Sequence, residues 1–250
     1  MWPYPKIVAH RGGGTLAPEN TIAGLRAGLA YGFHAVEFDV MLSKDGIGVV
    51  VHDPEFGRTI FGQGRVADHT AAELARMDAG RWLKPEFRGE PVPLFLEFVD
   101  YCKAHRIWMN IEIKPSEGQE ATTGRWVAQT TRLRFAAEVA VGDPAQLPLL
   151  SSFSMEALAA ARDAAPDVPR ACLFDQLPGN WAHIASELGA VAIHTNHKHL
   201  SPATARAVKE AGFGLFCYTV NEPKRGREIL GWGVDGFCTD RIDLIAPTFA

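Results

Sequence analysis

The 250-residue sequence lacks the features that mark secreted, membrane-spanning or disulfide-rich proteins. Its four cysteines are far apart, form no CxxC pair and lie in apolar surroundings, which predicts buried free thiols in place of disulfides or a zinc site. No stretch approaches the roughly 18 consecutive apolar residues that a membrane span requires. The first residues show no charged segment followed by an apolar one, as a signal peptide would. We therefore expect a cytoplasmic protein without a membrane span.

An excess of charge of one sign is lacking as well. The chain has 25 Lys and Arg against 29 Asp and Glu, interspersed along its length, for a formal net charge of -4. This pattern gives no basic stripe of the kind that a nucleic-acid backbone or an anionic membrane requires. We expect a small-molecule partner and no nucleic acid, and the sequence carries no signal of an oligomeric state.

What the chain does contain is a repeated alternation of short apolar runs and amphipathic segments. Eight runs are typical of strands, and each apart from the last is followed by a predicted helix. The predicted strands end near His10, Asp39, Glu112, Phe153, Phe174, His194, Thr219 and Cys238. This order predicts an α/β protein with a (β/α)8 TIM barrel, in a single domain over residues 1–250. Doubly wound sheets alternate similarly, but polar residues at the carboxyl ends of the strands favour the barrel, which keeps its active site there.

Two local patterns break the regular alternation near the start. After the turn at residues 12–14 we expect a helix with Pro18 and Glu19 in its first turn. The alternating run at residues 35–42, the Asp45-Gly46 turn and the apolar run after it predict a β-hairpin over 35–53. Residues 54–92 are irregular, apart from a short helix opened by a capping box at Thr70 and Glu73. They are predicted to form a small insertion after the second barrel strand.

Carboxylates gather on the predicted inner face of two barrel strands. Period-two alternation places Glu37 and Asp39 on one face of the second strand, and Glu112 repeats the arrangement on the next barrel strand. One such pair alone is typical of a solvated face of a strand. A solvated face gives no reason for a carboxylate to recur in the same arrangement on the next strand, as Glu112 does. Three converging carboxylates repel each other unless protons or a cation neutralise them. Without a thiolate nearby, this ligand set favours Mg²⁺ or Ca²⁺ over zinc.

Basic and imidazole side chains surround the same predicted site. The hairpin returns His52 to the level of Asp39, close to His10, and two imidazoles can serve as base and acid of a phosphoryl transfer. Arg11 and Lys114 add positive charge, which suits a phosphate. The residues thus predict a metal-assisted reaction on a small phosphorylated molecule.

A set of short motifs carries a resemblance to a known family. These are His10-Arg11-Gly12, Pro18-Glu19-Asn20-Thr21, Glu37-x-Asp39, Asp45-Gly46, His52-Asp53, Arg58-Thr59, Glu73-Leu74, Asn110-Ile111-Glu112-Ile113-Lys114, Ser151-Ser152-Phe153, Thr219-Val220-Asn221, Asp235-Gly236 and Thr239-Asp240. In this order and at this spacing the chain resembles the glycerophosphodiester phosphodiesterases of the bacterial cytosolic type. The resemblance covers nearly the whole chain.

The resemblance implies a barrel with an insertion after the second strand. It also implies an activity, the hydrolysis of a glycerophosphodiester, such as glycerophosphocholine or glycerophosphoethanolamine, to sn-glycerol 3-phosphate and an alcohol. It implies site residues of three kinds: Ca²⁺ or Mg²⁺ ligands (Glu37, Asp39, Glu112), a general acid and base (His10, His52), and substrate contacts (Arg11, Lys114, Phe153, Tyr218).

Departures from the family pattern lie outside the acid, base and metal positions. Tyr218 stands where Trp is frequent and Phe95 where Leu is usual, which affects the shape of the alcohol pocket and local packing. Two alternatives share the barrel: a related phosphodiesterase acting on lysophospholipids or phosphoinositides, and an inactive barrel that only binds a phosphorylated ligand. The first is disfavoured by the lack of membrane features, the second because all five central acid, base and metal residues are present.

Overall fold

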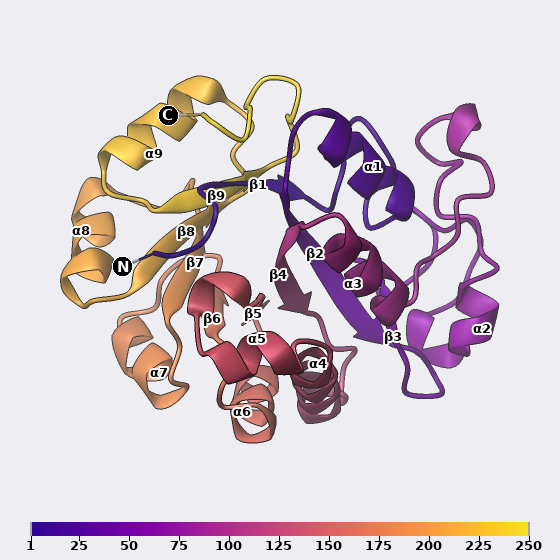
Figure 1. The fold of residues 1–250 in the computed structure, drawn as a ribbon, viewed down its shortest axis with the longest axis horizontal. Helices are drawn as coiled ribbons and strands as arrows, with labels where there is room; N and C mark the ends of the chain where they lie inside the picture. The colour runs from indigo at the N-terminus through magenta and orange to yellow at the C-terminus, as the bar shows by residue number, and fades with distance from the viewer. Residues whose placement is uncertain (1, 250) are drawn as a thin grey trace.

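The computed structural model describes residues 2–249 and forms a closed barrel of eight parallel strands (Figure 1). The barrel strands are β1 (Ile7–His10), β2 (Ala35–Leu42), β4 (Trp108–Ile113), β5 (Leu149–Ser152), β6 (Arg170–Phe174), β7 (Ala192–Asn196), β8 (Gly214–Tyr218) and β9 (Gly236–Thr239). They follow one another around the ring, and pairing of β1 with both β9 and β2 closes it. The predicted (β/α)8 barrel is confirmed.

The helices cover the outside of the barrel. They are α1 (Ile22–Ala30), α3 (Phe95–Ala104), α4 (Glu120–Arg134), α5 (Ala136–Val141), α6 (Met155–Ala164), α7 (Trp181–Glu187), α8 (Pro202–Glu210) and α9 (Pro223–Gly231). Their buried faces pack on outward-facing strand residues such as Phe38, which contacts Phe98 of α3. The segment between β4 and β5 forms two helices, α4 and α5, because the backbone at Phe135 leaves the helical region and its ring is buried in the core.

The first helix begins at Ile22, so the expectation that Pro18 and Glu19 form its first turn is wrong. Asn20 has φ +58°, a left-handed conformation that interrupts a right-handed helix. Thr21 is the N-cap, and its hydroxyl accepts a hydrogen bond from the Gly24 amide at 3.0 Å. Residues 18–20 therefore form a loop against the barrel mouth.

The hairpin predicted over 35–53 is confirmed. β3 (Gly48–Val50) pairs antiparallel with β2, with Val40 opposite Val50, and Gly46 takes φ +74° in the turn. The Val51 amide donates to the Asp39 carbonyl at 3.2 Å, which brings the next residue, His52, to the barrel mouth. Segment 54–92 then follows as the insertion, and it contains the predicted capping box at the start of α2 (Ala71–Leu74).

Aromatic side chains close the amino end of the barrel. The Trp2 ring stacks on Phe216 with 5.7 Å between centroids and lies 6.4 Å from the ring of His194. Tyr4 packs against Trp108 at 5.0 Å. The interior of the barrel is therefore closed at the amino ends of the strands and open at their carboxyl ends.

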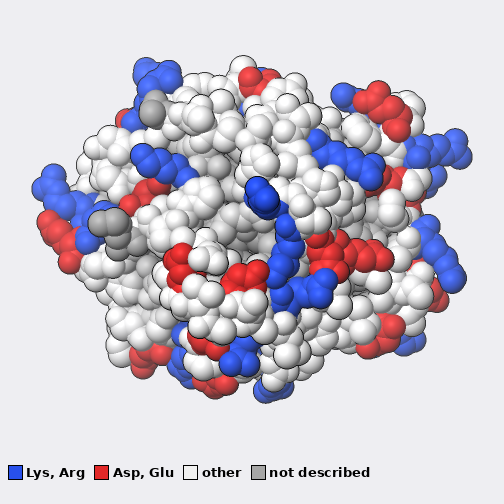
Figure 2. All heavy atoms as spheres, viewed as in Figure 1, with Lys and Arg blue, Asp and Glu red and all other residues white. Residues whose placement is uncertain are grey.

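The remaining sequence predictions concern cysteines, charge and membranes. All four cysteines are free and buried, as expected. On the face drawn in Figure 2, acidic and basic side chains are interspersed. None of the helices within residues 2–249 has both the length and the apolar character that crossing a membrane would need.

Candidate active site

A cavity of about 210 Å³ lies at the carboxyl ends of the strands. Eight of the nine predicted site residues line it: His10, Arg11, Glu37, His52, Glu112, Lys114, Phe153 and Tyr218. The ninth, Asp39, lies directly behind its wall and is 1% exposed. The structure thus brings all the predicted residues to one place.

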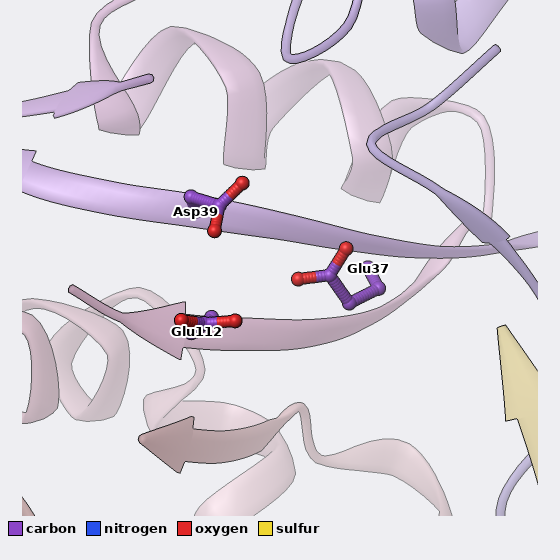
Figure 3. A group of neighbouring side chains, drawn as sticks. All are labelled: Glu37, Asp39 and Glu112. Carbon is purple, nitrogen blue, oxygen red and sulfur yellow. The ribbon is translucent and has the colours of Figure 1, made fainter. Parts of the chain in front are cut away.

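The three carboxylates project from neighbouring strands into the same space (Figure 3). Glu37 and Asp39 come from β2, and Glu112 lies on β4 directly opposite Asp39 in the strand pairing. One oxygen of each lies within 4.8 Å of the others. The alternation of the strands, read from the sequence, accounts for this arrangement.

Burial and mutual repulsion perturb the carboxyl groups of this cluster. Burial, with Asp39 and Glu112 as neighbouring charges, raises the pKa of Glu37 well above its usual value. Burial and Asp39 raise the pKa of Glu112 to about 7. Burial alone would raise the pKa of Asp39, but Arg11 and Lys114 outweigh it and hold that pKa below its usual value. The protein's own cations thus neutralise the cluster only in part.

The donor set fits a divalent cation. Glu37 Oε2 is buried and has no hydrogen-bond partner within residues 2–249. Buried acceptors are normally satisfied, and carboxylate oxygens are the ligands that Mg²⁺ and Ca²⁺ prefer. Among the described residues, Glu37, Asp39 and Glu112 form the one group with this geometry.

Asn20 holds Asp39 in place, a role that the sequence did not predict. Its side-chain NH₂ donates to Asp39 Oδ2 at 2.8 Å, and its carbonyl accepts from the Asp39 amide at 3.3 Å. Asn20 is 3% exposed, and its left-handed backbone aims the side chain at the strand. The sequence signal available for this role was an Asn two residues after a Pro, in a segment that was expected to be helical.

His10 is oriented by Asp240, which follows β9. His10 Nδ1 lies 2.5 Å from Asp240 Oδ1, and its Nε2 faces the cavity, 3.7 Å from Glu37 Oε2. Asn221 donates to Asp240 Oδ2 at 2.9 Å and accepts from the Asp240 amide at 2.8 Å. Both residues lie at the carboxyl ends of predicted strands, but the sequence did not indicate that they support His10.

His52 has a carboxylate on one ring nitrogen and an ammonium on the other. Its Nδ1 lies 2.6 Å from Asp53 Oδ1, and its Nε2 lies 2.8 Å from Lys114 Nζ. Burial lowers the pKa of His52; Asp39 opposes this, and Arg11 and Lys114 add to it. The neutral imidazole, with a lone pair on Nε2, is therefore favoured.

Aromatic and small polar side chains form the rest of the cavity. The rings of Phe153 and Tyr218 meet edge to face at 5.7 Å, and the Tyr218 hydroxyl donates to the Phe174 carbonyl. The floor contains three buried polar atoms without a hydrogen-bond partner among residues 2–249: Asn110 Oδ1, Ser151 Oγ and His194 Nε2. Burial lowers the pKa of His194 to about 3, so its ring is neutral.

Phe95, a departure from the family pattern, belongs to the core and not to the cavity. It is fully buried and packs on Phe38 and Trp126. Of the two aromatic departures, Tyr218 alone lines the cavity and Phe95 affects packing.

Fold and site together define a TIM-barrel enzyme whose catalytic mouth combines a carboxylate cluster, two cations and two carboxylate-bound histidines. Residues 10–244 match the model of the Glycerophosphoryl diester phosphodiesterase family. The chain belongs to this family, and the predicted enzyme class, a phosphodiesterase, is confirmed.

Relatives and solved structures agree with this assignment. The chain is 30% identical over 239 residues to the glycerophosphodiester phosphodiesterase of Caldanaerobacter subterraneus subsp. tengcongensis, covering 94% of this chain and 93% of the relative. A phosphodiesterase of Oleispira antarctica, solved in complex with the product sn-glycerol-3-phosphate, superposes with a TM-score of 0.82 at 32% identity, covering 94% and 93% of the two chains. The glycerophosphodiester phosphodiesterase of Agrobacterium tumefaciens gives a TM-score of 0.78 at 28% identity, covering 96% and 98%.

Proposed function

We propose that this protein hydrolyses glycerophosphodiesters, such as glycerophosphocholine or glycerophosphoethanolamine, to sn-glycerol 3-phosphate and an alcohol. The observation that carries the proposal is the convergence on one cavity of two histidines, Arg11 and Lys114, and the carboxylate cluster. The product bound to the similar Oleispira antarctica enzyme supports it. We assign the activity to residues 1–250 as one domain, acting in the cytoplasm.

Glu37, Asp39 and Glu112 would hold a divalent cation, Ca²⁺ or Mg²⁺. When bound, the cation supplies positive charge that stabilises the charge developing on the phosphoryl oxygens. Arg11 and Lys114 would bind the phosphate beside it, since their side chains line the same cavity.

The two histidines divide the proton transfers. His52, whose neutral form is favoured, takes the proton from an attacking water at Nε2 while the water oxygen bonds to phosphorus. The bond from phosphorus to the alcohol oxygen breaks, and His10, bound to Asp240 through Nδ1, gives its Nε2 proton to that oxygen. His52 then releases its extra proton to solvent and His10 takes one up, so both histidines return to their starting states and the net reaction adds water across the bond from phosphorus to the alcohol oxygen.

The cavity also offers contacts for the remainder of the substrate. Phe153 and Tyr218 present apolar ring surface to carbon atoms. The three unpartnered polar atoms of the floor are suited to the two glycerol hydroxyls, because buried donors and acceptors gain free energy when they are paired.

The test is hydrolysis of glycerophosphocholine by the purified protein, with Ca²⁺, with Mg²⁺ and with EDTA, reading sn-glycerol 3-phosphate through a coupled dehydrogenase. We expect turnover that needs a cation. Loss of either His10 or His52 to alanine should lower kcat by about 10²-fold or more, while circular dichroism stays unchanged. His183→Ala, at an exposed histidine on α7, is the matched control.

Further arms use lysophosphatidylcholine and a phosphoinositide as substrates. Turnover of these and not of glycerophosphocholine would replace the proposed substrate. Absence of product from every diester, with every cation, would leave a phosphate-binding barrel and refute the enzyme proposal.

A further inference from the structure

The guanidinium of Arg58 bridges two carboxylates at the mouth of the cavity. Its Nη1 and Nη2 donate to the two oxygens of Glu19 at 2.6 and 2.7 Å, and its Nε donates to Asp53 Oδ2 at 2.7 Å. Arg58 lies in the insertion, 39 residues from Glu19, which is in the loop between β1 and α1. One side chain thus ties the insertion to the barrel mouth.

Each of these carboxylates supports a different functional group. Glu19 Oε1 also accepts from Arg11 Nη1 at 2.8 Å, so it fixes the proposed phosphate contact. Asp53 Oδ1 lies 2.6 Å from His52 Nδ1, so it fixes the orientation of the imidazole. We propose that Arg58 is a positioning residue that couples Arg11 to His52, an inference that rests on the proposed function of those two groups.

The coupling runs through a closed ring of charged groups and the His52 imidazole. On the inner side, Lys114 Nζ lies 2.8 Å from His52 Nε2 and 3.7 Å from Asp39, and Arg11 Nε lies 3.3 Å from Asp39. Arg58 is the member of the ring furthest from the reaction, with 46% of its side chain exposed. It is also the one member contributed by the insertion.

The geometry requires arginine specifically. All three guanidinium nitrogens donate, two to one carboxylate and one to another, and a lysine ammonium cannot reproduce this planar fork. The backbone beneath is anchored, because the next residues, Thr59 and Ile60, are buried and the Gly57 amide donates to the Ile60 carbonyl. Burial alone would raise the pKa of Glu19, but Arg58 and Arg11 outweigh it and lower that pKa, which keeps the carboxylate charged.

A positioning role and a structural role predict different results. The Arg58 side chain is 46% exposed, and without it Glu19 still pairs with Arg11 and Asp53 with His52, so loss of this side chain should scarcely change Tm. Arg11 would then be less well oriented toward phosphate, which raises KM, and His52 less well oriented toward the proton it accepts, which lowers kcat. Both constants should therefore change together.

The experiment compares Arg58→Gln, Arg58→Lys and Arg58→Ala with Arg65→Gln, the control at another exposed arginine of the insertion. We expect kcat/KM for glycerophosphocholine to fall by about 10 to 100-fold in all three Arg58 variants, since each loses charge-assisted hydrogen bonds. Guanidinium ion at millimolar concentration should restore part of the activity of Arg58→Ala. Glu19→Gln should raise mainly KM, and Asp53→Asn should lower mainly kcat.

Two readouts do not need turnover. Calorimetric affinity for inorganic phosphate should fall in Arg58→Gln, and the ¹⁵N NMR signal of His52 Nδ1 should move, although Arg58 does not contact that ring. Both stay unchanged in Arg65→Gln. A wild-type protein that hydrolyses no diester would refute the proposed function, while these two measurements still decide the role of Arg58.

The inference is overturned if Arg58→Gln matches Arg65→Gln in phosphate affinity and in the His52 signal. It is also overturned if activity is lost together with a large fall in Tm and without rescue by guanidinium, since that result indicates a structural role.

Discussion

Replacing Glu112 by glutamine should make the metal-free protein more stable at neutral pH and no more stable at acid pH. In the folded protein, burial and Asp39 raise the pKa of Glu112 from 4.5 to about 7. Between these values the folded state holds a proton that the unfolded chain has released. Stability of the wild type therefore falls as the pH rises from about 4.5 through about 7.

The size of the effect follows from the pKa difference. The pKa difference is about 2.5, and each pKa unit corresponds to about 1.4 kcal/mol. The wild type therefore loses on the order of 3 kcal/mol of its free energy of unfolding above pH 7. For a chain of this length, 1 kcal/mol changes Tm by roughly 2 to 4 °C. Glu112→Gln has no ionisable group at residue 112. Its Tm should thus exceed that of the wild type by about 6 to 12 °C at pH 8 and by little at pH 4.

The assay is thermal unfolding in EDTA from pH 4 to pH 8, with Glu210→Gln as the control at an exposed carboxylate of α8. Added Mg²⁺ or Ca²⁺ should stabilise the wild type most at high pH, because a cation takes the place of the proton. A difference between wild type and Glu112→Gln that stays constant across this pH range would refute the reasoning.

Two further substitutions test the mouth and the floor of the cavity. Gly14→Ala should destabilise the protein by about 2 kcal/mol or more, because Gly14 has φ +53° and a Cβ there would lie 2.1 Å from the Asp240 carbonyl oxygen. Gly118→Ala is the control: Gly118 has φ +78° and a Cβ there would meet no atom within 4 Å, so this variant has the left-handed backbone strain without the clash. Equal losses of stability in the two variants, measured by urea unfolding, would contradict the clash at Gly14. Ser151→Ala should weaken binding of sn-glycerol 3-phosphate by about tenfold, the loss of one hydrogen bond, and leave binding of n-propyl phosphate unchanged. Calorimetry that shows equal weakening of both ligands would argue against a hydroxyl contact at Ser151.

The sequence predicted the parts of the site that depend on strand periodicity. Alternation in β2 is sufficient to place Glu37 and Asp39 on one face, and the turn at Asp45 and Gly46 is sufficient to return His52 to their level. Pairing of β2 with β4, the next barrel strand, then supplies Glu112, since consecutive parallel strands of a barrel lie side by side. Each step uses a local rule, and the structure shows each arrangement.

The supporting contacts could not be predicted in the same way, because they join segments far apart in the chain. Asp240 reaches His10 across 230 residues, and Arg58 reaches Glu19 from a segment without regular structure. The helical propensity assigned to residues 18–20 was overridden by Asn20, whose side chain is engaged by Asp39. The motifs containing these residues resembled those of the family, but spacing alone does not say which side chains meet.

The aromatic closure at Trp2 has a consequence for the order of events in turnover. Trp2 packs from the amino end on Phe216 and against His194, the same two rings that form the cavity floor. A ligand that reaches the floor must therefore leave by the way it entered. If the glycerol moiety binds at the floor, as the proposed function implies, the alcohol forms toward the opening and departs first, and the phosphorylated product behind it blocks the next substrate until it dissociates. Product inhibition by the phosphomonoester should then be competitive, and inhibition by the alcohol should be weak.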